Sequence, residues 1–260
     1  MKKVVINNTV LELYDGIEEL PIVNFQKFNK YMLIDSGIGS DFEDVNNHIS
    51  TLARLVKSSD KAKALQELQN MRQNMFMIIS NISPKHMAFA AFIHSVNGQK
   101  VTDLSDENLK RILDSLRTVK RSKIIDLLTG LKKKVQTELV LYFPAEFNSA
   151  KNKEAYDQIK RRTLLVLEGI TTGKDMAEEI EKIDATLFAG YKPKSFAGAD
   201  SAEIEHDKGF ETSCLLISQE LHIDAKTLTT LAFYSALETI KKQLEAKNKS
   251  ISKMRKMRKN

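Results

Sequence analysis

Apolar residues recur at helical intervals along most of this chain, and this period constrains the fold more than any other feature. From Pro21 onward, apolar side chains are spaced three and four residues apart, which is the spacing of one face of a helix. Ten Gly and four Pro in 260 residues are too few for the tight turns of a β-sandwich or barrel. The sequence therefore predicts a mainly α-helical protein built as a multi-helix bundle.

Two short segments have the character of β-hairpins instead. Val4–Ile6 and Val10–Leu13 flank Asn7-Asn8, and Asn tolerates the positive φ of a two-residue hairpin turn. A second small hairpin is predicted at Asn97-Gly98. Since two strands alone are marginal in water, we expect residues 2–14 to pack on helices of this chain or on a neighbouring subunit.

Residues that favour helix N-termini mark several of the predicted boundaries. Ser40 with Glu43 matches a capping box, Ser83 precedes Pro84, and Ser105 precedes a further helix. The long predicted helices that follow the first one cover about 40–56, 59–79, 105–116, 120–143, 149–171 and 174–188. We expect them to share one core that includes Phe42, Ile49, Leu52, Leu68, Ile78, Leu113, Ile125, Leu128, Leu165 and Ile180.

The helical pattern is interrupted once, over residues 189–209. This segment contains Gly190, Pro193 and Gly198 and has no periodic apolar stripe, which is typical of an exposed loop or linker. The sequence therefore predicts a hairpin plus helical domain over 1–188, a linker over 189–209, and a C-terminal helical hairpin with a basic tail over 210–260.

The basic tail accounts for the net positive charge of the chain. Residues 241–260 contain nine Lys or Arg and one Glu, a local charge of +8, whereas the whole chain carries +6. Such a concentration of charge indicates a polyanionic or acidic neighbour. The predicted partner-binding residues are Lys253, Met254, Arg255, Lys256, Met257, Arg258 and Lys259.

The tail has two other interpretations. Terminal Lys and Arg can simply keep a helix end soluble and favour its dipole. Contact with nucleic acid would be to phosphates and independent of sequence, because the tail has no aromatic side chain for base stacking. Met254 and Met257, at helical spacing, favour an adaptable protein contact.

Catalytic and metal-binding patterns are absent from the sequence. His206 with Glu203, Glu205 and Asp207 forms one cluster of ligand types, which we interpret as a solvated acidic loop rather than a metal site. Cys214 occupies an apolar helix position, as a structural thiol would. We therefore expect a non-enzymatic protein with no cofactor and no metal.

Other residues are assigned to structural roles. His86 and His94 flank an apolar run and are expected at the edge of the core, bonded to backbone. The Lys132–Lys134 run is interpreted as a solvated helix face. A single cysteine fits a reducing compartment, and no stretch reaches the roughly 18 apolar residues of a membrane span, so we expect a soluble protein without a membrane partner.

One stretch reads GIEELPIVNFQKFNKY over residues 16–31 and continues as GIGSDFEDV over 37–45. Another runs from Phe210 to Leu221 and continues through Asp224, Leu228-Thr229 and residues 233–237. Both stretches resemble proteins of the structural modules of tailed bacteriophages, in particular the crAss-like phages of the gut, and the second is similar to helical segments of tail-assembly proteins.

The resemblance implies a structural subunit of the virion, at the head–tail junction or in the tail, that acts by protein–protein assembly. Its expected partners are other virion proteins and further copies of itself, and its expected location is the virion, with the host cytoplasm during assembly. Two alternatives stay open: a tail-assembly chaperone, and a basic-tailed protein associated with nucleic acid.

Overall fold

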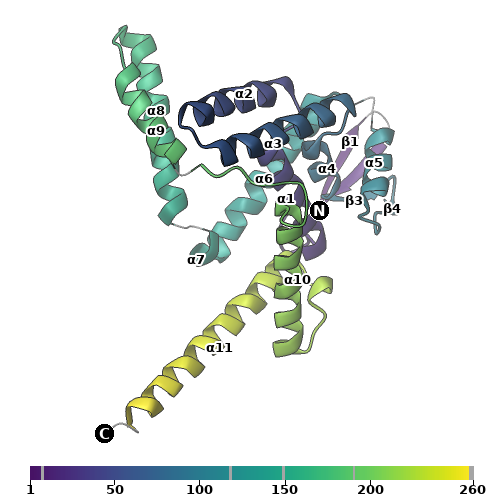
Figure 1. Ribbon diagram of the computed structural model, residues 1–260. Helices are drawn as coiled ribbons and strands as arrows, with labels where there is room; N and C mark the ends of the chain where they lie inside the picture. Colours follow the sequence, from purple (N-terminus) through teal and green to yellow (C-terminus); the bar gives the residue numbers. More distant parts are fainter. Residues whose placement is uncertain (7–8, 117–118, 148–149, 190, 258–260) are drawn as a thin grey trace. The chain divides into compact units, whose positions relative to one another are not determined.

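The protein is mainly α-helical with one small antiparallel sheet, which confirms the predicted fold class (Figure 1). The computed structural model describes residues 1–6, 9–116, 119–147, 150–189 and 191–257, with the backbone alone for 150–153, 155 and 250–257. Within these residues lie eleven α-helices, a short 3-10 helix and four strands. No described helix combines the length and the apolar character needed to cross a membrane.

The two predicted hairpins are present, and they join into a single sheet of order β1-β2-β3-β4. β2 pairs antiparallel with β3, with Leu11 opposite Val96. The four strands are β1 Lys2–Ile6, β2 Thr9–Leu13, β3 Ile93–Val96 and β4 Gln99–Lys100. The N-terminal strands therefore pack within their own chain. The Asn7-Asn8 turn lies outside the described residues.

The second hairpin turn also holds the two hairpins together. Asn97 and Gly98 have φ angles of 51° and 81°, as a primed turn requires. The Asn97 amide donates to the Val10 carbonyl at 2.7 Å, and the Asn97 side-chain oxygen accepts from the Val10 amide at 2.8 Å. One turn residue thus extends the pairing between β2 and β3.

The described chain divides into two compact units, 1–138 with 194–260 and 139–193. The helices of the first unit are α1 Ile22–Gly37, α2 Phe42–Lys57, α3 Lys61–Ile79, α4 Pro84–Ala90, α5 Asp106–Ser115, most of α6 Arg121–Tyr142, α10 Ala202–Leu221, the 3-10 helix η1 Ala225–Thr227, and α11 Thr230–Met257. The second unit holds the end of α6, then α7 Pro144–Phe147, α8 Ala150–Thr172 and α9 Ala177–Ala189.

The core of the first unit lies among the sheet, α1 and α4. The Phe28 and Phe92 rings meet edge to face at 4.9 Å, and the buried Asn24 side chain donates to the Ala91 carbonyl at 2.9 Å. The side chains that are fully shielded from solvent include Leu11, Leu13, Ile17, Leu20, Phe89, Phe92 and Ile93. This core fixes the position of α1, from which α2 and α3 follow.

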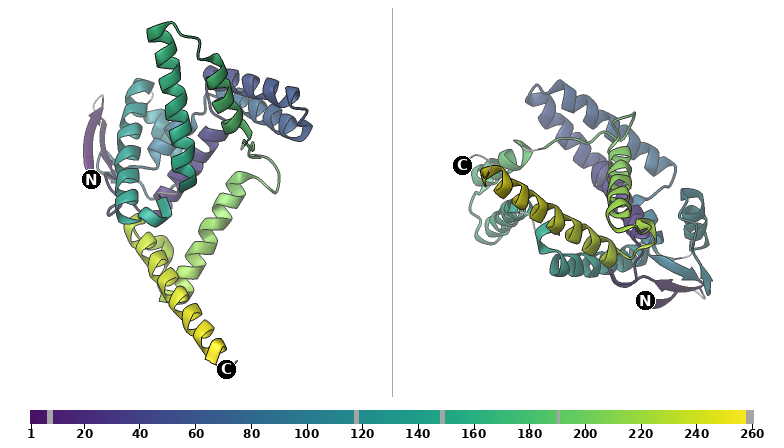
Figure 2. Two further views of the ribbon diagram at one scale, coloured as in Figure 1. Left: turned by 90° about the vertical axis from the view of Figure 1, so that its left-hand side faces the viewer. Right: turned by 90° about the horizontal axis from the view of Figure 1, so that it is seen from below.

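The C-terminal helices belong to this same unit, because residues 17–22 pair with residues 228–231. The Ile22 amide donates to the Leu228 carbonyl at 2.9 Å, and the buried Thr230 donates to the Leu20 carbonyl through both its amide and its hydroxyl. α10 also packs on α1, and Figure 2 shows α11 continuing as one long helix. Within the predicted linker, residues 191–201 are irregular and α10 begins at Ala202.

The predicted shared core over residues 40–187 is wrong for four of its ten members. Phe42, Ile49, Leu68 and Ile125 are 75%, 50%, 45% and 38% exposed, whereas Leu128 is buried. The remaining five, Leu52, Ile78, Leu113, Leu165 and Ile180, are half-buried. α2 and α3 lie where the period predicted them, but their buried faces are rotated from the expected ones.

Position within the sheet should decide how much a side chain stabilises the fold. We expect Leu11→Ala on β2 to lower the free energy of unfolding by about 2–5 kcal/mol, because Leu11 is fully buried and the substitution leaves a cavity. Val5→Ala on β1, where the side chain is 63% exposed, should change it by no more than about 0.5 kcal/mol. Urea denaturation measures both; equal losses would contradict this description of the core.

Candidate functional site

The α2–α3 hairpin carries its apolar residues outside and its polar residues inside. On α2 the predicted stripe of Phe42, Val45, Ile49, Leu52 and Val56 is present, but Phe42, Ile49 and Val56 are 75%, 50% and 64% exposed. The residues that α2 buries, His48 and Leu55, each come one position before a stripe residue. Since each residue turns the helix by about 100°, the buried face lies beside the apolar stripe.

On α3 the exchange is more complete, because polar side chains are buried and apolar side chains are exposed. Its buried residues are Glu67, Asn70 and Asn74, at 2%, 1% and 0% exposure, spaced as one helix face. Its exposed apolar residues are Leu65, Leu68, Met75, Phe76 and Ile79, at 65%, 45%, 49%, 62% and 80% exposure. A solvent-facing helix of a monomer normally has the opposite arrangement.

Hydrogen bonds explain why the polar face of α3 is the buried one. The Asn74 side chain donates to the Ile38 carbonyl at 2.8 Å, and Asn70 donates to the Lys194 carbonyl at 3.1 Å. The Glu67 carboxylate lies 2.7 Å from Nδ1 of His48. The two asparagines thus donate to backbone carbonyls and Glu67 pairs with His48, as buried polar groups require. The side-chain oxygen of Asn74 is buried without a hydrogen-bond partner among the described residues.

The two partners of His48 favour its protonated form. Its Nδ1 lies 2.7 Å from the Glu67 carboxylate and its Nε2 lies 2.8 Å from the Ile38 carbonyl. A ring that donates to both of these oxygens carries a proton on each nitrogen. The hydrogen bond to Glu67 accordingly raises the pKa of His48 above its usual value, against the opposing effect of burial.

The start of α2 differs slightly from the predicted one. The N-cap is Asp41 rather than Ser40, and the capping box is formed with Asp44 rather than Glu43. The Asp44 carboxylate accepts from the Asp41 amide at 3.2 Å and from the Ser40 amide at 2.8 Å. The sequence contains two overlapping capping patterns, Ser40 with Glu43 and Asp41 with Asp44. The second pair forms the reciprocal hydrogen bonds.

The two exposed stripes lie on the same side of the hairpin. α2 and α3 lie side by side and antiparallel, joined by residues 58–60 (Figure 1), and the His48–Glu67 contact marks their facing sides. Ile49 follows His48 by one residue and Leu68 follows Glu67 by one residue, so both stripes are displaced in the same rotational sense. In an antiparallel pair, this displacement points the stripes to one side. We call that side, together with the adjoining outer surface of α3 that carries Leu65 and Phe76, the α2–α3 apolar face: Phe42, Ile49, Val56, Leu65, Leu68, Met75, Phe76 and Ile79.

The second unit also exposes apolar side chains. α8 and α9 are joined by an ion pair between Arg162 and Asp184, with Nε and Oδ1 2.5 Å apart. Around it, α8 leaves Tyr156, Ile159, Leu164, Leu167 and Ile170 between 49% and 76% exposed. Contiguous apolar surface of this kind marks protein contacts.

A cavity of about 600 Å³ lies elsewhere in the first unit, among the α3–α4 turn, α4, α5 and the start of α6. Its lining includes His86, whose Nε2 is buried without a hydrogen-bond partner among the described residues, and burial lowers the pKa of this histidine. Arg121 donates to the Asn81 side chain at its edge. One carboxylate, that of Asp114, is also among the residues that line this cavity.

The interpretation of residues 203–207 as a loop is wrong, because they lie in α10, where Glu203, His206 and Asp207 contact side chains of α1. His206 Nδ1 lies 2.8 Å from the Gln26 amide nitrogen, and Asp207 accepts from Lys30 at 2.6 Å. Burial lowers the pKa of His206 and raises that of Glu203. Across the described residues, no group of three or more His, Cys, Asp or Glu could hold a metal ion.

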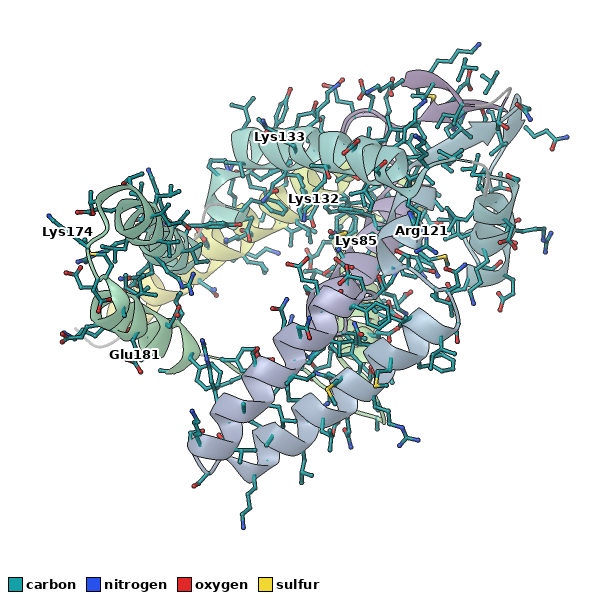
Figure 3. The ribbon with its side chains drawn as sticks, turned by 90° about the horizontal axis from the view of Figure 1, so that it is seen from above. Lys85, Arg121, Lys132, Lys133, Lys174 and Glu181 are labelled. Atoms are coloured by element: carbon teal, nitrogen blue, oxygen red, sulfur yellow. The ribbon has the colours of Figure 1, made fainter. Side chains whose placement is uncertain are left out.

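The other residues singled out in the sequence have ordinary surroundings. Cys214 is buried on α10, and burial raises the pKa of its thiol. His94 contacts the Tyr14 hydroxyl at 3.1 Å, where a backbone partner was expected. Lys132 and Lys133, labelled in Figure 3, are exposed on α6. Lys134 pairs with Asp15 at 2.8 Å.

The predicted partner-binding tail is described only in part. Lys253 to Met257 form the last turns of α11, where the backbone alone is described, and Arg258 and Lys259 lie outside the described residues. The assignment of these seven residues to partner binding stays a prediction.

Comparison with protein-family models, with curated proteins and with solved structures finds no match to this chain. The assignment of a site therefore depends on the geometry described above.

The His48–Glu67 pair should make stability depend on pH. Because the pKa of folded His48 is raised, its contribution is fully present below the unfolded value of about 6.5 and is lost as the pH rises through the folded value. Glu67→Gln removes the charge that binds the imidazolium. We expect the free energy of unfolding of the wild type to be higher than that of this variant, with the largest difference at about pH 6. The difference should shrink as the pH rises through the pKa of folded His48.

The control for this experiment is Glu205→Gln, which removes an exposed carboxylate from α10. The free energy of unfolding of this control should differ little from that of the wild type at every pH. Urea denaturation at several pH values measures both variants. A Glu67→Gln deficit that does not change with pH would contradict the charged pair.

Proposed function

We propose that this chain is a non-enzymatic structural subunit of a tailed-phage particle, at the head–tail junction or in the tail, and that it acts by protein–protein assembly. The observation that supports an assembly role is the α2–α3 hairpin, which buries Glu67, Asn70 and Asn74 and exposes eight large apolar side chains. A protein that functioned alone would gain stability from the opposite orientation of α3.

The spacing of the apolar face indicates the kind of partner. Phe42, Ile49 and Val56 are seven residues apart on α2, and Leu68 and Met75 are seven residues apart on α3. Seven-residue repeats pack against helices that carry a matching stripe, with side chains of one helix inserted between those of the other. A helical protein surface is therefore the expected partner.

The phage assignment is supported by the resemblance of residues 16–31 and 37–45, and of residues 210–221 with Asp224, Leu228-Thr229 and 233–237, to structural-module proteins. These stretches include most of α1, the start of α2, the later part of α10 and the first turns of α11.

Mass spectrometry of purified particles tests this function directly. We expect the protein to be present in a fixed number of copies per particle. A tail-assembly chaperone would instead be found in assembly lysates and be absent from mature particles, and that result would replace the proposed function by its alternative.

The basic tail provides a second measurement of assembly. Replacing Lys253, Arg255, Lys256, Arg258 and Lys259 by Gln should lower incorporation into particles, and rising salt should do the same, because exposed ion pairs contribute only about 0–1 kcal/mol each and are screened. The matched control replaces the exposed Lys132 and Lys133 of α6 by Gln. If both variants were incorporated equally at every salt concentration, the only remaining function of the tail would be to keep the chain soluble.

A further inference from the structure

We infer that the α2–α3 apolar face binds the same face of a second copy of this chain, so that two hairpins form a four-helix bundle. This inference rests on the proposed function, since it names the partner of the surface that supports an assembly role. Three properties of the face select a second copy: its symmetry, its area and the distribution of charge along the hairpin.

The apolar stripe of α2 is symmetric about its middle. Phe42 and Val56 each lie seven residues from Ile49, which is about 10 Å along the helix. A two-fold axis that crosses α2 at Ile49 therefore brings Ile49 to its own equivalent and sets Phe42 opposite the partner's Val56. Leu68 lies near the same level, because the neighbouring Glu67 contacts His48.

The area of the face is sufficient for a stable dimer. Phe42, Ile49, Val56, Leu65, Leu68 and Met75 are each 45–75% exposed and would be covered in this arrangement. Together they present roughly 600 Å² of apolar surface, taking about 100 Å² for each side chain. A standard interface buries about 800 Å² per partner, of which about 56–65% is apolar, so the requirement is met.

Charge along the hairpin selects one of two orientations. The acidic residues Asp41, Glu43 and Asp44 lie at the start of α2. The basic residues Arg54, Lys57, Lys61 and Lys63 lie near the turn between α2 and α3, beside Asp60. An axis along the hairpin would place like-charged ends together. An axis across the hairpin places each acidic start beside the basic turn of the other copy, which electrostatic complementarity favours.

Sedimentation of the full chain over a range of concentrations tests the dimer. We expect a monomer–dimer equilibrium that Ile49→Glu shifts to monomer, with the dissociation constant raised at least about 100-fold, because the dimer would bury two carboxylates without partners. Ile49 is half-exposed, so the variant should keep the circular dichroism of the wild type. The matched control is Leu215→Glu on α10, where Leu215 is 58% exposed. It should leave the dimer intact.

Cysteine cross-linking tests the orientation. Ile49→Cys should form a disulfide-linked dimer under mild oxidation, because the axis passes beside this residue. Phe42→Cys and Val56→Cys should form none alone, since each would lie about 20 Å from its own equivalent, but a mixture of the two variants should cross-link. The wild type, whose one cysteine is the buried Cys214, is the control.

The outcomes separate this inference from the proposed function. A chain that stays monomeric at all concentrations, or a dimer that Ile49→Glu leaves unchanged, overturns self-association through this face. If such a chain is still found in particles and Ile49→Glu prevents its incorporation, the occupant is a different helical protein and the proposed function stands. Cross-linking of Phe42→Cys alone would overturn the orientation across the hairpin.

Discussion

The buried carboxylate of Glu67 determines how α3 is oriented, and much of the surface of the first unit depends on it. A charge removed from water costs several kcal/mol unless it is paired and hydrogen-bonded. His48 provides that partner on α2, and its second ring nitrogen reaches the Ile38 carbonyl at the end of α1. One ionic pair thus connects three helices. With Glu67 turned inward, Leu68 and its apolar neighbours face solvent.

The helices and both hairpins could be predicted from the sequence, because period and turn residues are local properties. The orientation of each helix could not. A stripe such as Phe42, Ile49 and Val56 shows that one face is apolar, but whether that face meets the chain's own core or another protein depends on long-range contacts. A second signal was present: Glu67, Asn70 and Asn74 also share one face of α3. The joining of the two hairpins through Asn97 and Val10 likewise depends on residues 87 positions apart.

A hairpin held together by polar contacts has a consequence for assembly. Its two helices are fixed before any partner arrives, because Asn70, Asn74 and the His48–Glu67 pair bond to groups of the same unit. Association would then not have to supply the free energy of ordering a loose segment, which lowers the cost of binding. The apolar face would act as a rigid surface.

The pairing of residues 17–22 with residues 228–231 has a consequence for synthesis. The hydrogen bond of Thr230 to Leu20 spans 210 positions, so the first unit cannot close until most of the chain has left the ribosome. Until then Leu20 and Ile17 lack the segment that shields them, and contacts between distant residues form slowly. A nascent chain in this state exposes apolar surface to bystander proteins for longer than one built from local contacts. The yield of native protein should therefore depend on the rate of translation and on the supply of general folding factors.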